Sequence, residues 1–238
     1  MVGMDSDTFL PAIAAATDRF TASVAGLDAA ALRGPSLLPG WTRGHVVAHA
    51  ARNAHALANV LRTAAGGPPT PMYPSVEARN AAIEEGSTRS PDVLLREVTE
   101  SAAAYADAAR AVPDDRLDRE VEWIGRFLPA RLALGGRLRE VEFHHVDLDA
   151  GYIPADWDAD FVVRELGVAA EALAARPEAP AVLLVATDVE VPWRIAGAGP
   201  ERAVTGPSRA LLAWLAGRSA GHGLQADGGA LPTLPGWP

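Results

Sequence analysis

The spacing of apolar residues predicts that the first 150 residues are mainly helical. Apolar side chains recur every three or four positions, which places them on one face of a helix. Serine or threonine stands before several of these segments, and glycine or proline stands after them, as is usual at helix starts and ends. We therefore expect helices over residues 7–26, 42–65, 75–86, 90–112 and 129–150, of which four are long enough to form a bundle. The pattern at 114–127 predicts no element.

The pattern changes after residue 150. A helix is expected over 156–178, followed by a short continuous apolar run at 181–187. Residues 189–197 alternate with the period of a strand, 201–205 fit a third strand, and a last helix is expected from Pro207 to Gly217. We predict an α+β protein, with an N-terminal four-helix bundle in residues 1–152 and a small C-terminal α/β domain in residues 153–238.

Three polar residues beside the apolar stripes of two predicted helices indicate a metal site. Glu140 and His144 are four residues apart, so on a helix their side chains leave the same face, about 40° apart. His49 lies beside the stripe of the earlier helix. Two imidazoles and one carboxylate suit Zn²⁺ and leave one position open for water or substrate. This interpretation makes the protein an enzyme with an open zinc site.

The same pattern also has a purely structural interpretation. A single histidine beside an apolar stripe is more often a hydrogen-bonded structural residue than a ligand, and His45 with His49 forms a competing pair at the same spacing. Asp147 follows His144 by one turn, where it would either orient the imidazole or stand as a surface charge. His55 is expected on the solvent face of its helix. The residues alone leave these alternatives open.

Arginines supply the remaining candidate chemistry. Arg218 follows Gly217 at the end of the last predicted helix. An arginine there usually binds the terminal carbonyl groups or water, and a bidentate contact with a substrate carboxylate is the alternative. Four arginines flank the candidate ligands, and we expect them to be mostly solvated: Arg43, Arg52, Arg137 and Arg139.

Composition excludes several functional classes. The chain has 30 acidic and 21 basic residues, for a net charge of -9, which argues against nucleic-acid binding. It contains no lysine and no cysteine, so Schiff-base lysines, cysteine nucleophiles, thiolate zinc sites and disulfides are excluded. The first ten residues lack the pattern of a signal peptide, and no apolar run is long enough for a membrane span. We expect a cytoplasmic monomer with no membrane partner.

Two segments resemble a known family. LPGWTRGHVVAHAARN (38–53) and GGRLREVEFHHVDLDAGY (135–152) are similar to segments of the mycothiol-dependent maleylpyruvate isomerases, which belong to the DinB-like metal-binding helical superfamily. The resemblance extends over nearly the whole chain and implies a DinB-like four-helix domain followed by a small α/β domain. It implies that His49, Glu140 and His144 hold zinc. By a looser match, it places Arg218 of the C-terminal domain near the active site.

The resemblance also implies a reaction, the cis–trans isomerisation of 3-maleylpyruvate to 3-fumarylpyruvate in gentisate breakdown, with mycothiol as the thiol coenzyme. Zinc would stabilise the mycothiol thiolate, which adds to the double bond and leaves after rotation, and Arg218 would stabilise the charge on the dicarboxylate. A mycothiol S-transferase that conjugates other electrophiles at the same zinc site is the alternative. A non-catalytic zinc module of the anti-sigma type is disfavoured, because such modules generally use cysteine.

Overall fold

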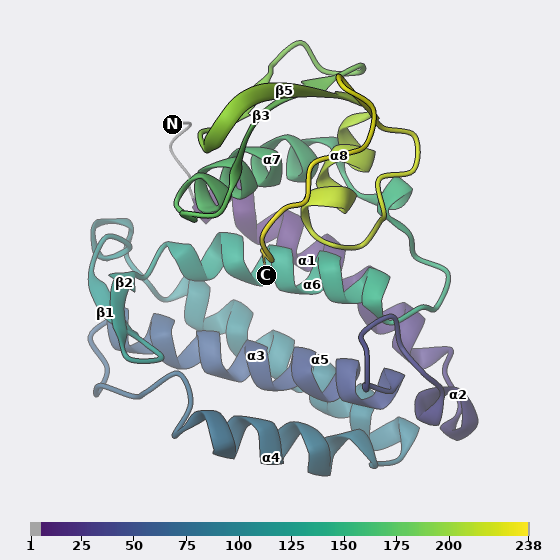
Figure 1. The fold of residues 1–238 in the computed structure, drawn as a ribbon. Helices are drawn as coiled ribbons and strands as arrows, with labels where there is room; N and C mark the ends of the chain where they lie inside the picture. The colour runs from purple at the N-terminus through teal and green to yellow at the C-terminus, as the bar shows by residue number, and fades with distance from the viewer. Residues whose placement is uncertain (1–5, 238) are drawn as a thin grey trace. The chain divides into compact units, whose positions relative to one another are not determined.

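The computed structural model describes residues 6–237, and its contacts divide the chain into two compact units, one up to Gly151 and one from Tyr152 on (Figure 1). Within the described residues the chain has mixed α and β structure, with eight α-helices and two small sheets. The predicted mixture of helices and strands is thus confirmed. Residues 1–5, on which part of the signal-peptide expectation rests, lie outside the described residues.

The first unit is mainly helical. Its helices are α1 (Ser6–Ala25), α2 (Ala29–Arg33), α3 (Arg43–Ala64), α4 (Val76–Ser87), α5 (Pro91–Arg110) and α6 (Leu132–Asp147). Helix α3 packs against α4, α5 and α6, while α1 packs against α5 and α6. Because three helices cover α3, it is buried on nearly all sides rather than on the single stripe that its sequence predicts.

Local sequence sets where the helices begin. Thr42 caps α3 with its hydroxyl, which accepts from the backbone N–H of His45, and Ser75 caps α4 in the same way. Gly44 allows α3 and α4 to approach closely, because a Cβ there would lie 2.3 Å from the carbonyl oxygen of Ser87. Helix α6 is shorter than the predicted 129–150, since Pro129 belongs to a strand and the left-handed backbone of Asp149 (φ 53°) follows the helix end.

The stretch without a prediction, 114–127, begins with a short 3₁₀ turn and continues into a hairpin. Strands β1 (Glu120–Trp123) and β2 (Arg126–Pro129) pair antiparallel through a two-residue turn. Both turn residues have positive φ, 44° at Ile124 and 75° at Gly125, as a type I′ turn requires. A β-branched residue is unusual in that backbone conformation.

The second unit combines two helices with a four-stranded sheet. It contains α7 (Ala159–Ala174), β3 (Pro180–Ala186), β4 (Trp193–Ile195), β5 (Ala198–Gly206), α8 (Ser208–Leu215) and β6 (Gln225–Ala226). The strand order is β4-β3-β5-β6, in which β3 and β5 are parallel and the other pairs antiparallel. Helix α7 packs against α8 and β4, and α8 also contacts β3 and β5.

Two expectations for this unit need correction. The strand expected over 189–197 is limited to β4, because Pro192 has no N–H for the ladder and Val191 is exposed. The helix expected over 156–178 begins only after Asp158, whose carboxylate accepts from the N–H groups of Asp160 and Phe161. Strand β6 was not predicted, since two residues are too few for a periodic signal. None of the described helices has the length and apolar character that crossing a membrane requires.

Candidate metal centre

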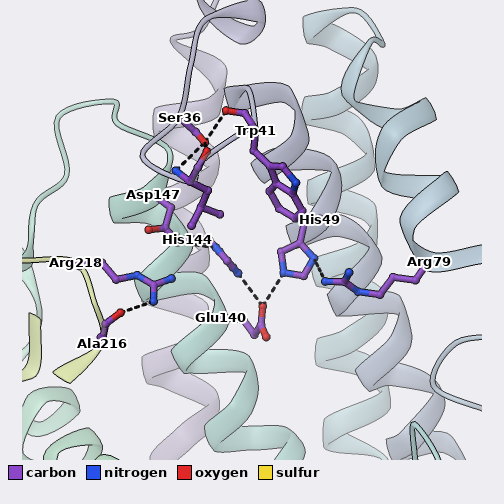
Figure 2. Close-up of polar contacts among 10 residues, drawn as sticks. Ser36, Trp41, His49, Arg79, Glu140, His144, Asp147, Ala216 and Arg218 are labelled. Carbon is purple, nitrogen blue, oxygen red and sulfur yellow. Dashed lines mark hydrogen bonds and ion pairs between the residues drawn. The ribbon is translucent and has the colours of Figure 1, made fainter. Parts of the chain in front are cut away.

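Helices α3 and α6 bring the three predicted ligands together. One ligand atom from each of His49, Glu140 and His144 lies within 4.8 Å of the other two. Glu140 Oε2 is 3.1 Å from His49 Nε2 and 3.2 Å from His144 Nε2. Figure 2 shows both imidazole rings pointing toward the Glu140 carboxylate, one from each helix. Within residues 6–237 this is the group of histidine and acidic side chains with the geometry to hold an ion.

The helix periodicity explains this arrangement. Glu140 and His144 are one turn apart on α6, and α3 packs alongside with His49 facing them. The two histidine rings lie 4.6 Å apart between centroids and are nearly perpendicular, at 89°. Their side chains are 6% and 14% exposed, whereas that of Glu140 is 32% exposed. The centre is therefore buried on the imidazole side and accessible on the carboxylate side.

The second ring nitrogen of each histidine, Nδ1, points away from Glu140 and also has a partner. Asp147, which is buried, has Oδ2 2.9 Å from His144 Nδ1 and thereby directs Nε2 toward Glu140, so the predicted orienting contact is confirmed. On the other side, Arg79 Nη2 lies 3.2 Å from His49 Nδ1. The Trp41 ring meets the His49 ring edge to face, with centroids 5.5 Å apart. Both rings are thus held in place by neighbours outside the three-residue group.

These contacts shift the proton equilibria of the centre. Burial lowers the pKa of His49, so this imidazole is neutral at pH 7. Burial acts to raise the pKa of Glu140, but hydrogen bonds with His144 and His49 bring it well below the ordinary value. Burial also acts to lower the pKa of His144, yet hydrogen bonds to Asp147 and Glu140 raise it to about 9. Without an ion, the centre contains a carboxylate between a neutral imidazole and an imidazolium.

The donor set fits a zinc ion. Two imidazole nitrogens and one carboxylate oxygen are preferred zinc donors, and three protein ligands leave room for a fourth from solvent or a ligand. The contact between the Asp147 carboxylate and Nδ1 of His144 is the carboxylate–histidine arrangement that is common at zinc sites. The competing residue His45 is not part of the group, because its Nδ1 contacts Thr42 and its Nε2 lies 3.1 Å from Glu84. His55 is exposed, as expected.

The flanking arginines are less solvated than predicted. Arg137 is fully buried and donates to the Ala50 carbonyl and the Asn53 side chain, at 3.0 and 3.1 Å. Arg43 donates to the carbonyl groups that follow α6, and Arg52 pairs with Glu97, while Arg139 is half-buried. The expectation was wrong because α3 and α6 are covered on faces that their sequences show as polar.

Arg218 belongs to the second unit, where it follows the left-handed Gly217 at the end of α8. It is half-buried, and its Nη1 donates to the Ala216 carbonyl at 2.7 Å (Figure 2). This is the terminal-carbonyl contact expected of an arginine at a helix end. Its role in catalysis stays a prediction.

Two residues beside the centre were not found from the sequence. Trp41 stands directly before Thr42, the N-cap of the helix that contains His49, yet an aromatic residue in a loop gives no spacing signal. Arg79 lies on α4, 30 residues from the histidine that it contacts. No local pattern links the two, so only the packing of α4 on α3 brings Arg79 to the centre.

Comparisons with known proteins agree with this geometry. A family model described as the mycothiol maleylpyruvate isomerase N-terminal domain matches residues 13–149. Crystal structures of a mycothiol-dependent maleylpyruvate isomerase and of its histidine-to-alanine mutant are similar to this chain, each with a TM-score of 0.90 and 31% identity over 98% of both chains. No match was found among curated proteins. The family match includes all three residues of the candidate metal centre, and the structural match includes both units. The chain belongs to the mycothiol maleylpyruvate isomerase family.

Proposed function

We propose that the protein is a cis–trans isomerase that converts 3-maleylpyruvate to 3-fumarylpyruvate with mycothiol as coenzyme and zinc at the centre formed by His49, Glu140 and His144. The observation that carries this proposal is the convergence of three donor atoms within 4.8 Å in a chain of this family. The similar crystal structures are of an enzyme described by that activity and that coenzyme. We also propose that α1, α3, α5 and α6, which pack pairwise, form the DinB-like four-helix bundle.

The chain's own residues prepare the centre for an anionic sulfur. When bound, a divalent cation would supply a Lewis acid that stabilises a thiolate near neutral pH. Glu140 contributes the single carboxylate of the donor set, so the cation keeps positive charge for a further anionic ligand. Asp147 fixes the ring of His144, and the Trp41 ring packs edge to face against that of His49. The absence of cysteine from the chain is consistent with a thiol that comes from outside.

Isomerisation requires that the substrate's central double bond become single long enough to rotate. Reversible addition of a thiol sulfur to one alkene carbon has this effect, because the displaced electron pair moves onto the conjugated carbonyl oxygen. Reversal of the addition restores the double bond in the trans geometry, with no net gain or loss of protons. The chain must therefore supply positive charge to the oxygen that becomes negative, and we assign this role to Arg218.

The test is a rate measurement on 3-maleylpyruvate with and without mycothiol, before and after removal of metal by a chelator. We expect turnover only with both mycothiol and metal, and recovery when zinc is returned. A parallel assay with monochlorobimane tests the mycothiol S-transferase alternative. Conjugation of bimane without isomerisation of maleylpyruvate would favour the transferase, and isomerisation that is unaffected by chelation would refute the role of the metal.

A further inference from the structure

A cavity of about 240 Å³ lies in the first unit beside the metal centre. It is lined by the loop at residues 71–76, by Arg79 on α4, and by the hairpin residues Glu122, Ile124 and Gly125. Drug-sized ligands usually occupy about 300–1,000 Å³, so this cavity suits a smaller molecule. Arg79 joins the cavity to the centre, because the same side chain reaches His49.

Arg79 is available for a ligand anion. Its Nη1 donates to Asn80 Oδ1 at 3.0 Å, its Nη2 contacts His49 Nδ1, and its guanidinium lies 5.8 Å from the centre of the Tyr73 ring. No aspartate or glutamate among the described residues forms an ion pair with it. The side chain is half-buried, so an ion pair with a ligand here would be less screened than one in open solvent.

Occupation of the metal centre would change what Arg79 can bind. A neutral histidine that offers Nε2 to a cation carries its hydrogen on Nδ1. Arginine has no acceptor atom, so Arg79 Nη2 and the Nδ1–H of His49 would then be two donors facing each other. The guanidinium would lose its acceptor at His49 and need another one. A carboxylate in the adjoining cavity matches the planar fork of arginine.

Tyr73 adds a hydroxyl to the same wall. It lines the cavity and is half-buried. Burial raises the pKa of Tyr73, so the hydroxyl keeps its hydrogen at neutral pH and can donate to an anion. Arg79 and Tyr73 thus offer a charged and a neutral donor in the lining of the same cavity.

At the tip of the hairpin, the apolar side chain of Ile124 lines the cavity, and the backbone of this residue is strained. Ile124 lines the cavity, its φ is 44°, and it is 58% exposed. Asparagine, aspartate or glycine is strongly preferred at this position of a type I′ turn, and strained residues of this kind cluster at ligand sites. The strain therefore points to a role for this side chain beyond forming the turn.

We infer that this cavity is the substrate subsite of the metal centre, in which Arg79 binds one carboxylate of the dicarboxylate while Ile124 covers the carbon chain. This inference rests on the proposed function and adds to it the residue that binds the substrate. Arg79 is here a residue that binds the substrate. Its role differs from that of Arg218, which we propose to stabilise the negative charge that develops on oxygen during the reaction.

The test compares the Arg79→Gln variant with the unmodified protein, both as full chains loaded with zinc. The measurements are the Kd of maleate, an unreactive cis dicarboxylate, by calorimetry, and the KM for maleylpyruvate and for mycothiol. Loss of an ion-paired hydrogen bond should raise the Kd of maleate and the KM for maleylpyruvate about 10–100-fold, with smaller changes in kcat and in the KM for mycothiol. Arg79→Lys, which keeps the charge but not the fork, should give an intermediate value. Arg126→Gln is the matched control, because it removes the same charge from the exposed hairpin outside the cavity lining. It should change none of the three constants more than about twofold.

The outcomes separate this inference from the proposed function. Unchanged maleate affinity in both Arg79 variants would overturn it, as would an effect limited to zinc content or to the KM for mycothiol. An equal loss of affinity in Arg126→Gln would show a general charge effect and would also overturn it. If the unmodified protein did not isomerise maleylpyruvate, the proposed function would fail, and maleate binding to the zinc-loaded variants would still decide whether Arg79 forms a carboxylate site.

Discussion

The affinity of the centre for zinc should depend steeply on pH, because a proton occupies a nitrogen that the ion needs. His144 has a pKa of about 9 in the metal-free protein, where burial opposes the shift and hydrogen bonds to Asp147 and Glu140 cause it. The pKa values of His49 and Glu140 are both lowered, so at pH 7 these two donors carry no proton that must leave. One proton should therefore be released for each zinc ion bound.

The size of the effect follows from the shift. Each pH unit below the pKa of His144 weakens zinc binding about tenfold, or ~1.4 kcal/mol, because the protonated form must first lose its proton. Because the pKa of His144 is about 9, His144 is mostly protonated throughout the range from pH 6 to 8, and zinc affinity should change about tenfold per pH unit over that range. The affinity should therefore be about 100-fold weaker at pH 6 than at pH 8, a difference of ~2.7 kcal/mol. A histidine at its ordinary pKa of 6.5 would give almost no change above pH 7.

Competition against a chromophoric chelator from pH 6 to 8 measures this slope, after correction for protonation of the chelator. Calorimetry in buffers of different ionisation enthalpy counts the protons released. Asp147→Asn is the matched variant, because it keeps an acceptor at His144 Nδ1 but removes the charge, so its slope should flatten above about pH 7. Zinc affinity in the unmodified protein that is constant across this range, with no proton release, would refute the reasoning.

Three further predictions concern single side chains. His49→Ala should lower zinc affinity by more than about 100-fold and abolish mycothiol-dependent turnover, whereas His55→Ala, exposed on the same helix, should keep both, as metal analysis and rate assays will show. Arg218→Gln should reduce kcat about 100-fold while zinc content stays constant, and an unchanged kcat would exclude it from catalysis. Denaturant titrations should show that Gly44→Ala lowers the free energy of unfolding by about 1–3 kcal/mol, because the added Cβ clashes with α4. Gly136→Ala, where a Cβ meets nothing within 4 Å, should raise the free energy of unfolding by about 0.5–1 kcal/mol.

The features that the sequence predicted are those fixed by neighbours along the chain. Thr42 and Ser75 cap their helices because a hydroxyl reaches an N–H only three residues away. Glu140, His144 and Asp147 share a face of α6 because helix periodicity alone places them there. The metal hypothesis could be formed from the sequence for this reason, and the packing of α3 on α6 brought in the third donor.

The features that were missed depend on contacts between distant segments or on unusual local chemistry. Arg137 looks solvated on a helical projection, but the surface of α3 covers it and supplies its acceptors. Arg79 reaches His49 through the packing of α4, which no spacing in the sequence reveals. The hairpin was not predicted because Ile124 occupies a turn position where asparagine, aspartate or glycine is the usual signal.

The charges of the centre explain why one proton and one metal ion can exchange with little rearrangement. In the metal-free protein the imidazolium of His144 lies between the carboxylates of Glu140 and Asp147, so a positive charge already holds the ring in place. Exchange of that proton for Zn²⁺ would raise the summed charge of His144, Glu140, Asp147 and the ion by one. Binding of an anionic sulfur would bring this sum back to its value in the metal-free protein. A second carboxylate among the donors would remove this preference for an anion, because the group would reach the same net charge without the sulfur. On the proposed function, the single carboxylate of Glu140 is therefore what makes the centre suited to bind a thiolate.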